Sequence, residues 1–166
     1  MEVDWWDQTA FRDLTITFTP SRHFSGRGLT DRAKSLWGGW SLKTPDEHIW
    51  VSGDGGYGEH FKEVGRRLGP IDFAMMECGQ YNDHWRMIHM FPEESIQAAL
   101  DAGVRKAMPI HWAGFSLSFQ HSWSEPARDF VRYAGAKNLD YATPEIGQLF
   151  TIAAAPQSTW WESYEN

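Results

Sequence analysis

The sequence predicts a layered α/β domain, and three observations support this prediction. Apolar runs typical of strands alternate with amphipathic stretches typical of helices through the second half of the chain. The chain has 166 residues, of which 42% are hydrophobic, and this is enough for one domain with its own core. No internal repeat or low-complexity linker divides the sequence. We therefore expect residues 1–166 to form a single domain.

The first part of the chain predicts strands. LTITFTP at 14–20 alternates, carries β-branched residues and stops at Pro20, which is the pattern of a strand. WGGWSL at 37–42 and HIWVSG at 48–53 also read as strands, and the turn KTPDE joins them. We expect these last two strands to pair as a hairpin.

From residue 59 onward, helices alternate with strands. EHFKEVGRRLG at 59–69 predicts a helix that Gly69-Pro70 ends, and IDFAMMECG at 71–79 predicts a buried strand. PEESIQAALDAG at 92–103 is the clearest helix, because it starts with proline and carries acids in its first turn. KAMPIHW at 106–112 predicts the next strand.

The last part of the chain predicts a third helix and two extended pieces. Ser124 is a candidate N-cap for a helix over 125–136. LDYATP at 139–144 and GQLFTI at 147–152 are expected to be extended. The order is strands first and then β-α-β-α-β, which predicts a layered α/β or α+β arrangement.

Charge and cysteine content exclude several classes of function. The net charge is −7 and no cluster of Lys or Arg is present, so we expect no nucleic-acid partner. No apolar run is long enough to span a bilayer, and the start MEVDWWDQ lacks the basic and apolar segments from which we would expect a signal peptide. The single cysteine, Cys78, suits a reducing compartment, so we expect a cytoplasmic protein. Because Cys78 lies in a predicted buried strand, an inert core thiol is favoured over a nucleophile.

A glycine-rich loop at 53–58 allows two interpretations. Its letters fit G-x-G-x-x-G, a strand precedes it, a helix follows it, and Glu77 lies about twenty residues on, where a ribose-binding acid would stand. A dinucleotide site is therefore one hypothesis. Asp54 opposes it, because a carboxylate inside the loop would repel a pyrophosphate.

Metal binding is the second hypothesis. His23, Asp54 and His111 each follow or end a predicted strand, so three strands could deliver them to one rim of a sheet. Imidazole and carboxylate groups are common zinc ligands. The alternative that each is a hydrogen-bonded structural residue stays open.

Several motifs together resemble a known family. In chain order they are TFTPSRHFSGRG, LWGGWSL, VSGDGGYGEHFKEVGRRLGPID, HMFPEESIQAAL and IHWAGFSLS. They resemble the C-terminal half of the metallo-β-lactamase superfamily, in the branch that contains N-acyl-phosphatidylethanolamine-hydrolysing phospholipase D. The resemblance implies the second half of an αββα sandwich, and it covers nearly the whole chain.

The resemblance also implies roles for individual residues. His23 would bind one metal of a two-zinc site, Asp54 would bridge both metals, and His111 would bind the second. His89 matches a histidine that lines the active site, and His121 matches a loop near the pocket only loosely; these two are the candidate catalytic residues. The remaining histidines match no catalytic position and are expected on the surface or in loops: His48, His60 and His84.

Two local departures from the family pattern stand out. Gly55 replaces a threonine that usually follows the aspartate, which removes a hydroxyl from the surroundings of Asp54. Phe91 stands where a polar residue usually caps the helix of PEES, and the usual capping scale puts that loss at about 1 kcal/mol.

The largest departure is that the superfamily signature H-x-H-x-D-H does not occur in these residues. By resemblance, the chain supplies only the second of two similar halves. The implied activity is metal-dependent hydrolysis of a phosphodiester or related ester in a small-molecule or lipid substrate, and we expect the isolated chain to be weakly active or inactive. We expect a homo-oligomer or pairing with an N-terminal half. The alternative is a non-catalytic, partner-binding half-domain.

Overall fold

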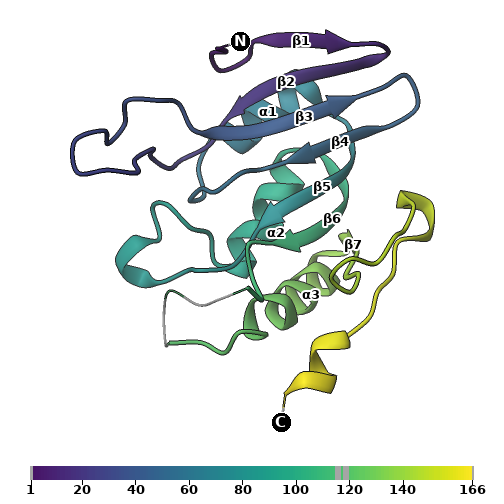
Figure 1. Cartoon of the computed structure of the whole chain (residues 1–166). Coiled ribbons are helices and arrows are strands. Elements are labelled where there is room, and N and C mark those ends of the chain that lie inside the picture. Colours follow the sequence, from purple (N-terminus) through teal and green to yellow (C-terminus); the bar gives the residue numbers. More distant parts are fainter. Residues whose placement is uncertain (1, 115–116, 118–119, 166) are drawn as a thin grey trace.

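The computed structural model describes residues 2–114, 117 and 120–165, and it shows one mixed β-sheet with helices on one of its faces (Figure 1). The strands are β1 Gln8–Phe11, β2 Leu14–Pro20, β3 Gly38–Lys43, β4 His48–Val51, β5 Ile71–Glu77, β6 Val104–Ile110 and β7 Asp140–Tyr141. The helices are α1 His60–Leu68, α2 Pro92–Asp101 and α3 Glu125–Lys137. Short 3-10 turns lie at Asp83–Trp85, Ile152–Ala154 and Trp160–Tyr164. None of the helices in the described ranges has the length and apolar character of a membrane span.

Strand direction decides where the loops meet. The strands lie in the sheet in chain order, β1 to β7. Strands β1 to β4 pair antiparallel, and strands β4 to β7 pair parallel. The helices α1, α2 and α3 lie in the connections between the parallel strands. Two antiparallel steps separate β2 from β4, so these two strands also run in the same direction. The carboxyl ends of β2, β4, β5 and β6 therefore reach one edge of the sheet.

The expected layered α/β architecture is confirmed. The strand expected at 14–20 and the helix expected at 59–69 appear as β2 and α1, and the elements from 71 to 112 appear within one to three residues of their expected bounds. Strand β1 was not anticipated, because QTAF is short and only partly buried. It pairs with β2 alone, so it is an edge strand held by backbone bonds.

Two local expectations are wrong. The hydroxyl of Ser124 donates to Glu165 instead of capping α3, and the hydroxyl of Ser122 accepts the N–H of Glu125 at 3.2 Å. His48 is neither a surface nor a loop residue, because it is 3% exposed in β4 and both ring nitrogens are bonded, to the hydroxyl of Ser41 and the carbonyl of Pro70.

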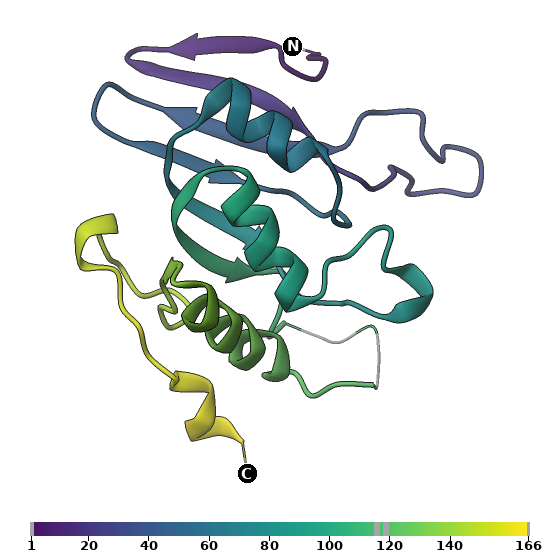
Figure 2. The same ribbon diagram turned by 180° about the vertical axis from the view of Figure 1, so that it is seen from behind.

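The main core lies between the sheet and its helices, which Figure 2 shows from the helical side. Trp50 on β4 is fully buried and meets Phe61 of α1 edge-on, with ring centroids 5.9 Å apart. The other large apolar members of this core include Val64, Met76, Met90, Ile96 and Phe130. Cys78 is also buried here, and burial raises the pKa of its thiol well above the ordinary value. The thiol therefore behaves as a core group, as expected from its strand.

The opposite face of the sheet is apolar and only partly covered. We call it the open face. The strand registers place on it a continuous set of side chains: Ile16, Phe18, Trp40, Leu42, Ile49, Val51, Phe73, Met75 and Met108. The C-terminal segment covers one end of it, where Phe150 packs on Phe73 at 5.8 Å and the ammonium of Lys106 donates to the carbonyl of Ile152 at 3.0 Å. Trp40, in contrast, keeps 39% of its surface exposed.

His60 is a partly buried base at the start of α1. Its ring lies on Phe61 with centroids 4.1 Å apart, and its Nε2 is buried without a hydrogen-bond partner among the described residues. Burial, and then the nearby charge of Arg22, lower the pKa of His60 to about 4. The neutral imidazole is therefore the form that the fold accommodates.

This environment predicts a pH-dependent stability. Below pH 6.5 the unfolded chain protonates His60, while the folded chain stays neutral until about pH 4, so stability is complete above pH 6.5 and falls as the pH falls toward 4. His48, whose pKa is also lowered by burial, adds to the same trend. We expect His60→Gln to remove about 2 kcal/mol of the loss in unfolding free energy between pH 7 and pH 4. Urea unfolding in the presence of a chelator measures this, with exposed His84→Gln as the control. Identical pH slopes for the native chain and His60→Gln would contradict it.

Candidate metal centre

Polar side chains from four loops gather at the edge where β2, β4, β5 and β6 end. His23 follows β2, Asp54 follows β4, His89 lies in the segment after β5, and His111 follows β6. The ring of His89 is close to both other imidazoles, with centroids 5.3 Å from His23 and 5.3 Å from His111. The structure thus brings together four of the five residues singled out in the sequence.

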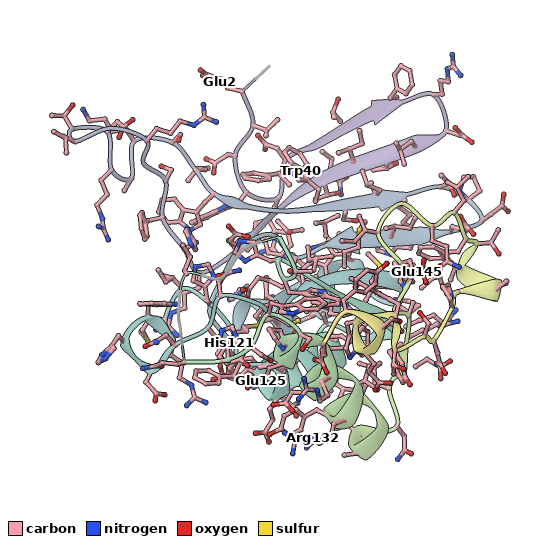
Figure 3. The ribbon with its side chains drawn as sticks, turned by 60° about the horizontal axis from the view of Figure 1, so that its bottom comes forward. Glu2, Trp40, His121, Glu125, Arg132 and Glu145 are labelled. Carbon is pink, nitrogen blue, oxygen red and sulfur yellow. The ribbon has the colours of Figure 1, made fainter. Side chains whose placement is uncertain are left out.

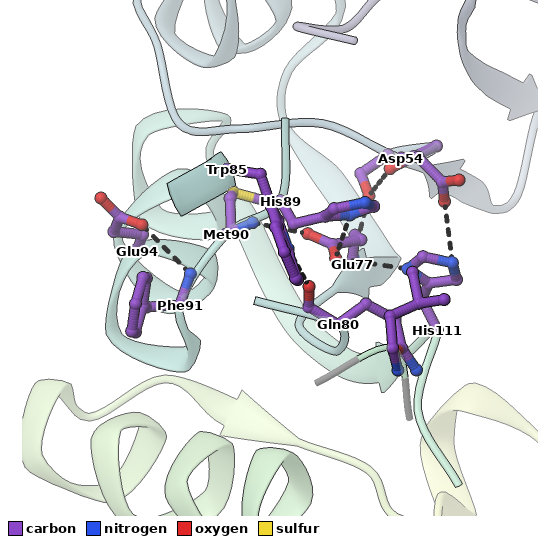
Figure 4. A network of polar contacts seen from close by, with 12 residues as sticks. Asp54, Glu77, Gln80, Trp85, His89, Met90, Phe91, Glu94 and His111 are labelled. Atoms are coloured by element: carbon purple, nitrogen blue, oxygen red, sulfur yellow. Dashed lines mark hydrogen bonds and ion pairs between the residues drawn. The ribbon is translucent and has the colours of Figure 1, made fainter. Parts of the chain in front are cut away.

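A buried carboxylate organises this cluster. Glu77, the last residue of β5, is fully buried. Its Oε1 lies 3.2 Å from Nδ1 of His89 and 3.3 Å from Nδ1 of His111, and its Oε2 accepts the N–H of Met90 at 2.9 Å (Figure 4). These three donors compensate the carboxylate for its lost water. Glu77 thereby ties the ends of β5 and β6 to the segment before α2.

The hydrogen bonds fix the same tautomer in three histidines. An ionised carboxylate and a carbonyl only accept hydrogen bonds, so a ring nitrogen facing one of them must carry the hydrogen. Nδ1 of His89 and Nδ1 of His111 face Glu77, and Nδ1 of His23 faces the carbonyl of Phe24 at 2.8 Å. In each neutral ring the lone pair is therefore on Nε2, the arrangement in which imidazoles bind metal ions while a second group orients them.

His111 stands closest to a second carboxylate. Its Nε2 lies 3.7 Å from Oδ1 of Asp54, too far for a hydrogen bond. Two ligands about 2.0–2.1 Å from a tetrahedral zinc ion lie roughly 3.3 Å apart, so the separation suits two donors facing one ion. The hydrogen bond to Glu77, and then the charge of Asp54, raise the pKa of His111 against the effect of burial. His111 also has a φ of 67°, which is strained for a histidine.

The donor set fits a divalent cation. Ligand atoms of Glu77, His89 and His111 lie within 4.8 Å of one another. The oxygens of Glu77 already accept three hydrogen bonds, which suits a group that orients the histidines, whereas the Nε2 atoms and the half-exposed carboxylate of Asp54 could hold an ion. Imidazole nitrogen and carboxylate oxygen together are a donor set that zinc and similar ions bind.

The glycine loop is packed against the protein itself. A Cβ on Gly56 would lie 2.3 Å from the carbonyl oxygen of Met87, and one on Gly55 would lie 3.1 Å from the backbone nitrogen of Arg22. The glycines thus allow close contact between the loops that carry His23, Asp54 and His89. Backbone of the neighbouring loops lies directly against Gly55 and Gly56, and Glu77 is bonded to histidines, so the geometry gives the dinucleotide hypothesis no support.

The two departures from the family pattern have local explanations. Gly55 lies so close to Arg22 and Ser21 that a threonine side chain would require the neighbouring loop to shift. Phe91 offers no capping oxygen, but its N–H donates to Oε2 of Glu94 at 3.1 Å, which completes one half of a capping box for α2.

His121 lies apart from the four clustered residues. Its ring stacks on Tyr81 with centroids 4.3 Å apart, and its Nδ1 faces the carbonyl of Ser122 at 3.0 Å. Figure 3 shows it next to Glu125 at the start of α3. Part of the loop in which it was singled out, residues 115–116 and 118–119, lies outside the described residues. Its catalytic role stays a prediction.

Sequence reasoning missed the role of Glu77. It treated the residue only as a possible ribose-binding acid. The sequence does carry a sign of this role, since a charged residue ends the apolar run IDFAMME. A carboxylate in a buried strand needs hydrogen-bond donors from elsewhere in the fold.

Comparison with known proteins gives the chain a family. The model of the beta-lactamase superfamily domain matches residues 1–112. An uncharacterized protein of Mycobacterium tuberculosis is 36% identical over 151 residues, which are 89% of this chain and 40% of that protein. N-acyl-phosphatidylethanolamine-hydrolyzing phospholipase D 1 of Caenorhabditis elegans is 27% identical, over 90% of this chain and 45% of that protein. The chain thus spans less than half the length of these relatives.

Two further comparisons agree. A Klebsiella pneumoniae protein named outer membrane protein RomA is 43% identical over 122 residues, which are 70% of this chain and 92% of that protein. The solved structure of Igni18, a metallo hydrolase from Ignicoccus hospitalis, superposes with a TM-score of 0.69 at 16% identity, over 91% of this chain and 61% of that one. By motifs, sheet topology and sequence match, this chain belongs to the metallo-β-lactamase superfamily, in the branch of the N-acyl-phosphatidylethanolamine-hydrolysing phospholipases D.

Proposed function

We propose that this chain provides one side of a two-zinc hydrolase site that acts on phosphodiester or related ester bonds. The observation that carries the proposal is the common tautomer of His23, His89 and His111, which leaves a lone pair on each Nε2, with that of His111 3.7 Å from a carboxylate oxygen of Asp54. The named phospholipase D relatives support a phosphodiester in a small-molecule or lipid substrate.

Each residue has a defined part in this proposal. His23 and His111 would bind one metal each, Asp54 would lie between the two, and His89 would bind a metal or the substrate. When bound, the metals would supply a hydroxide at neutral pH and polarise the scissile ester. Glu77 holds the imidazoles of His89 and His111 in place through their Nδ1 atoms, so little reorganisation is needed when a ligand arrives.

The chain alone offers few ligands. Three histidines and one carboxylate shared between two metals fall short of the three or four protein ligands that each zinc ion normally has. The signature H-x-H-x-D-H, which brings further histidines in the family, does not occur in the sequence. We therefore propose that the isolated chain binds zinc weakly and hydrolyses esters slowly or not at all.

The open face belongs to the same proposal. An apolar surface of this extent on one side of a sheet is unusual for a stable monomer. We propose that a second sheet covers it, from an N-terminal half of the family fold or from another copy of this chain. A non-catalytic half-domain that only binds a partner is the second candidate function, and exposed Trp40 on this face favours it. We also propose a cytoplasmic location, which the free, buried thiol of Cys78 supports.

Zinc titration tests the metal proposal. We expect calorimetry on the isolated chain to give a dissociation constant of about 1–100 μM, the range that an incomplete ligand set suggests. Asp54→Asn and His111→Asn should each weaken binding at least about tenfold, because each removes a ligand. Asp46→Asn and His84→Asn, at exposed positions, are the matched controls and should change nothing. Nanomolar binding, or equal binding by Asp54→Asn, would refute the proposed ligand set.

The orienting role of Glu77 has its own test. Glu77→Gln replaces one carboxylate oxygen by an amide group that donates. The N–H of Met90 can only donate, so the amide oxygen should keep that bond, and the amide nitrogen should then take the place of Oε1. Both histidines thereby lose the acceptor that holds their Nδ1–H tautomer. We expect nitrogen NMR of the imidazoles to show Nδ1–H on His89 and His111 in the native chain and a mixture in the variant, with zinc affinity lowered by about tenfold or more. Glu94→Gln is the control: it weakens the cap of α2 and should leave both tautomers unchanged. Unchanged tautomers in Glu77→Gln would contradict the assignment.

Light scattering tests the proposal that another chain covers the open face. We expect the isolated chain to form dimers or larger assemblies, and we expect Trp40→Glu to lower the association constant by about tenfold or more, because it places a charge in an apolar interface. Leu100→Glu, on the helical side of the sheet, is the control for added charge. A monodisperse native monomer would count against this part of the proposal.

A further inference from the structure

Beside His111, two cavities join into one groove. The first, of about 370 Å³, is lined by His111, Trp112 and the segment 143–148. The second, of about 460 Å³, is lined by Ala113, Trp123, Glu145, Ile146, Trp160 and Tyr164. Four lining residues are common to both cavities: Ala113, Glu145, Ile146 and Trp160. The groove therefore leads from an imidazole of the metal centre to a cluster of aromatic rings.

The far end of the groove is aromatic on several sides. The ring centroids of Trp123 and Trp160 are 6.2 Å apart, and those of Trp160 and Tyr164 are 6.2 Å apart with nearly perpendicular planes. Trp112 supports this arrangement, because it stacks on Trp123 and its indole N–H donates to the carbonyl of Pro109 at 3.0 Å. Three aromatic side chains therefore line the same cavity, where a guest can contact their rings.

The aromatic end of the groove carries a negative charge. Glu145 lines both cavities and is exposed, and no hydrogen bond or ion pair of its carboxylate occurs among the described residues. No Lys or Arg belongs to the described lining of either cavity. The neighbouring Glu165 is different, because Arg128 and Ser124 already engage it. An apolar guest would leave the carboxylate of Glu145 without a partner, whereas a cationic guest would match both the carboxylate and the rings.

We propose that this groove binds a quaternary or methylated ammonium group. Such a cation is large and weakly hydrated, so aromatic faces attract it through their quadrupoles without a large desolvation cost. The idea that the cation belongs to the substrate rests on the proposed function of the metal centre, whereas the binding itself does not.

Binding measured without metal separates the two proposals. With a chelator present, choline is titrated against 3,3-dimethyl-1-butanol, which has the same shape without the charge, and indole signals of Trp123 and Trp160 are followed by NMR. We expect choline to shift these signals and to bind at least about fivefold more tightly than the neutral alcohol. Equal affinity for both compounds, or no shift with either, would overturn the proposal.

Variants locate the site. Glu145→Gln and Tyr164→Leu should each weaken choline binding by about fivefold, since one removes the charge and the other a π face. Glu47→Gln, at the exposed turn between β3 and β4, controls for net charge and should bind choline normally. Asp54→Asn should also bind choline normally, so failure of the metal centre and failure of the groove give different results. An affinity unchanged in both Glu145→Gln and Tyr164→Leu would refute the assignment.

Discussion

The arrangement of the candidate site depends on one buried carboxylate. Glu77 has no contact with solvent, and an ionised group in that position is tolerated only if its hydrogen-bond acceptors are satisfied. His89, His111 and the backbone of Met90 supply the donors. The requirement works in both directions: the carboxylate needs the two histidines, and the histidines take their tautomer and orientation from the carboxylate. A polar network of this kind has few alternative arrangements, because each lost bond leaves a buried group unpaired.

The sheet makes this network possible. Because β2, β4, β5 and β6 run in the same direction, the segments that follow them reach the same edge. Glycine then allows these segments to approach one another more closely than other residues would. Gly79 is an example, since a Cβ there would lie 2.0 Å from the carbonyl oxygen of His111. The strained backbone of His111 is stabilised by the same close packing, and its imidazole is thereby directed toward Asp54 and Glu77.

Patterns that repeat along the chain made most of the fold predictable. Alternation in 14–20 and the capped, amphipathic run at 92–103 report local preferences, and both elements formed as expected. The predictions that proved wrong concern residues whose hydrogen-bond partners lie far away in the sequence. The hydroxyl of Ser124 bonds Glu165 instead of capping α3. His48 can be buried because Ser41 and Pro70 provide hydrogen-bond partners for both of its ring nitrogens. Glu77 is the same case within the site: its histidine partners lie 12 and 34 residues away, so its role follows from the tertiary structure alone.

We proposed that a second sheet covers the open face and that this chain supplies only part of the ligands of each metal, and one association would satisfy both proposals. A sheet that packs on Trp40, Val51 and Met75 would extend past the edge where His23 and Asp54 lie, because the open face ends at that edge. Further ligands could then approach the metals from the side that this chain leaves open. The orientation of the imidazoles needs no such partner, since Glu77 and the carbonyl of Phe24 provide it within the chain. Association would therefore raise metal affinity by adding ligands to histidines that are already oriented. These side chains would lose little further conformational entropy when a metal binds.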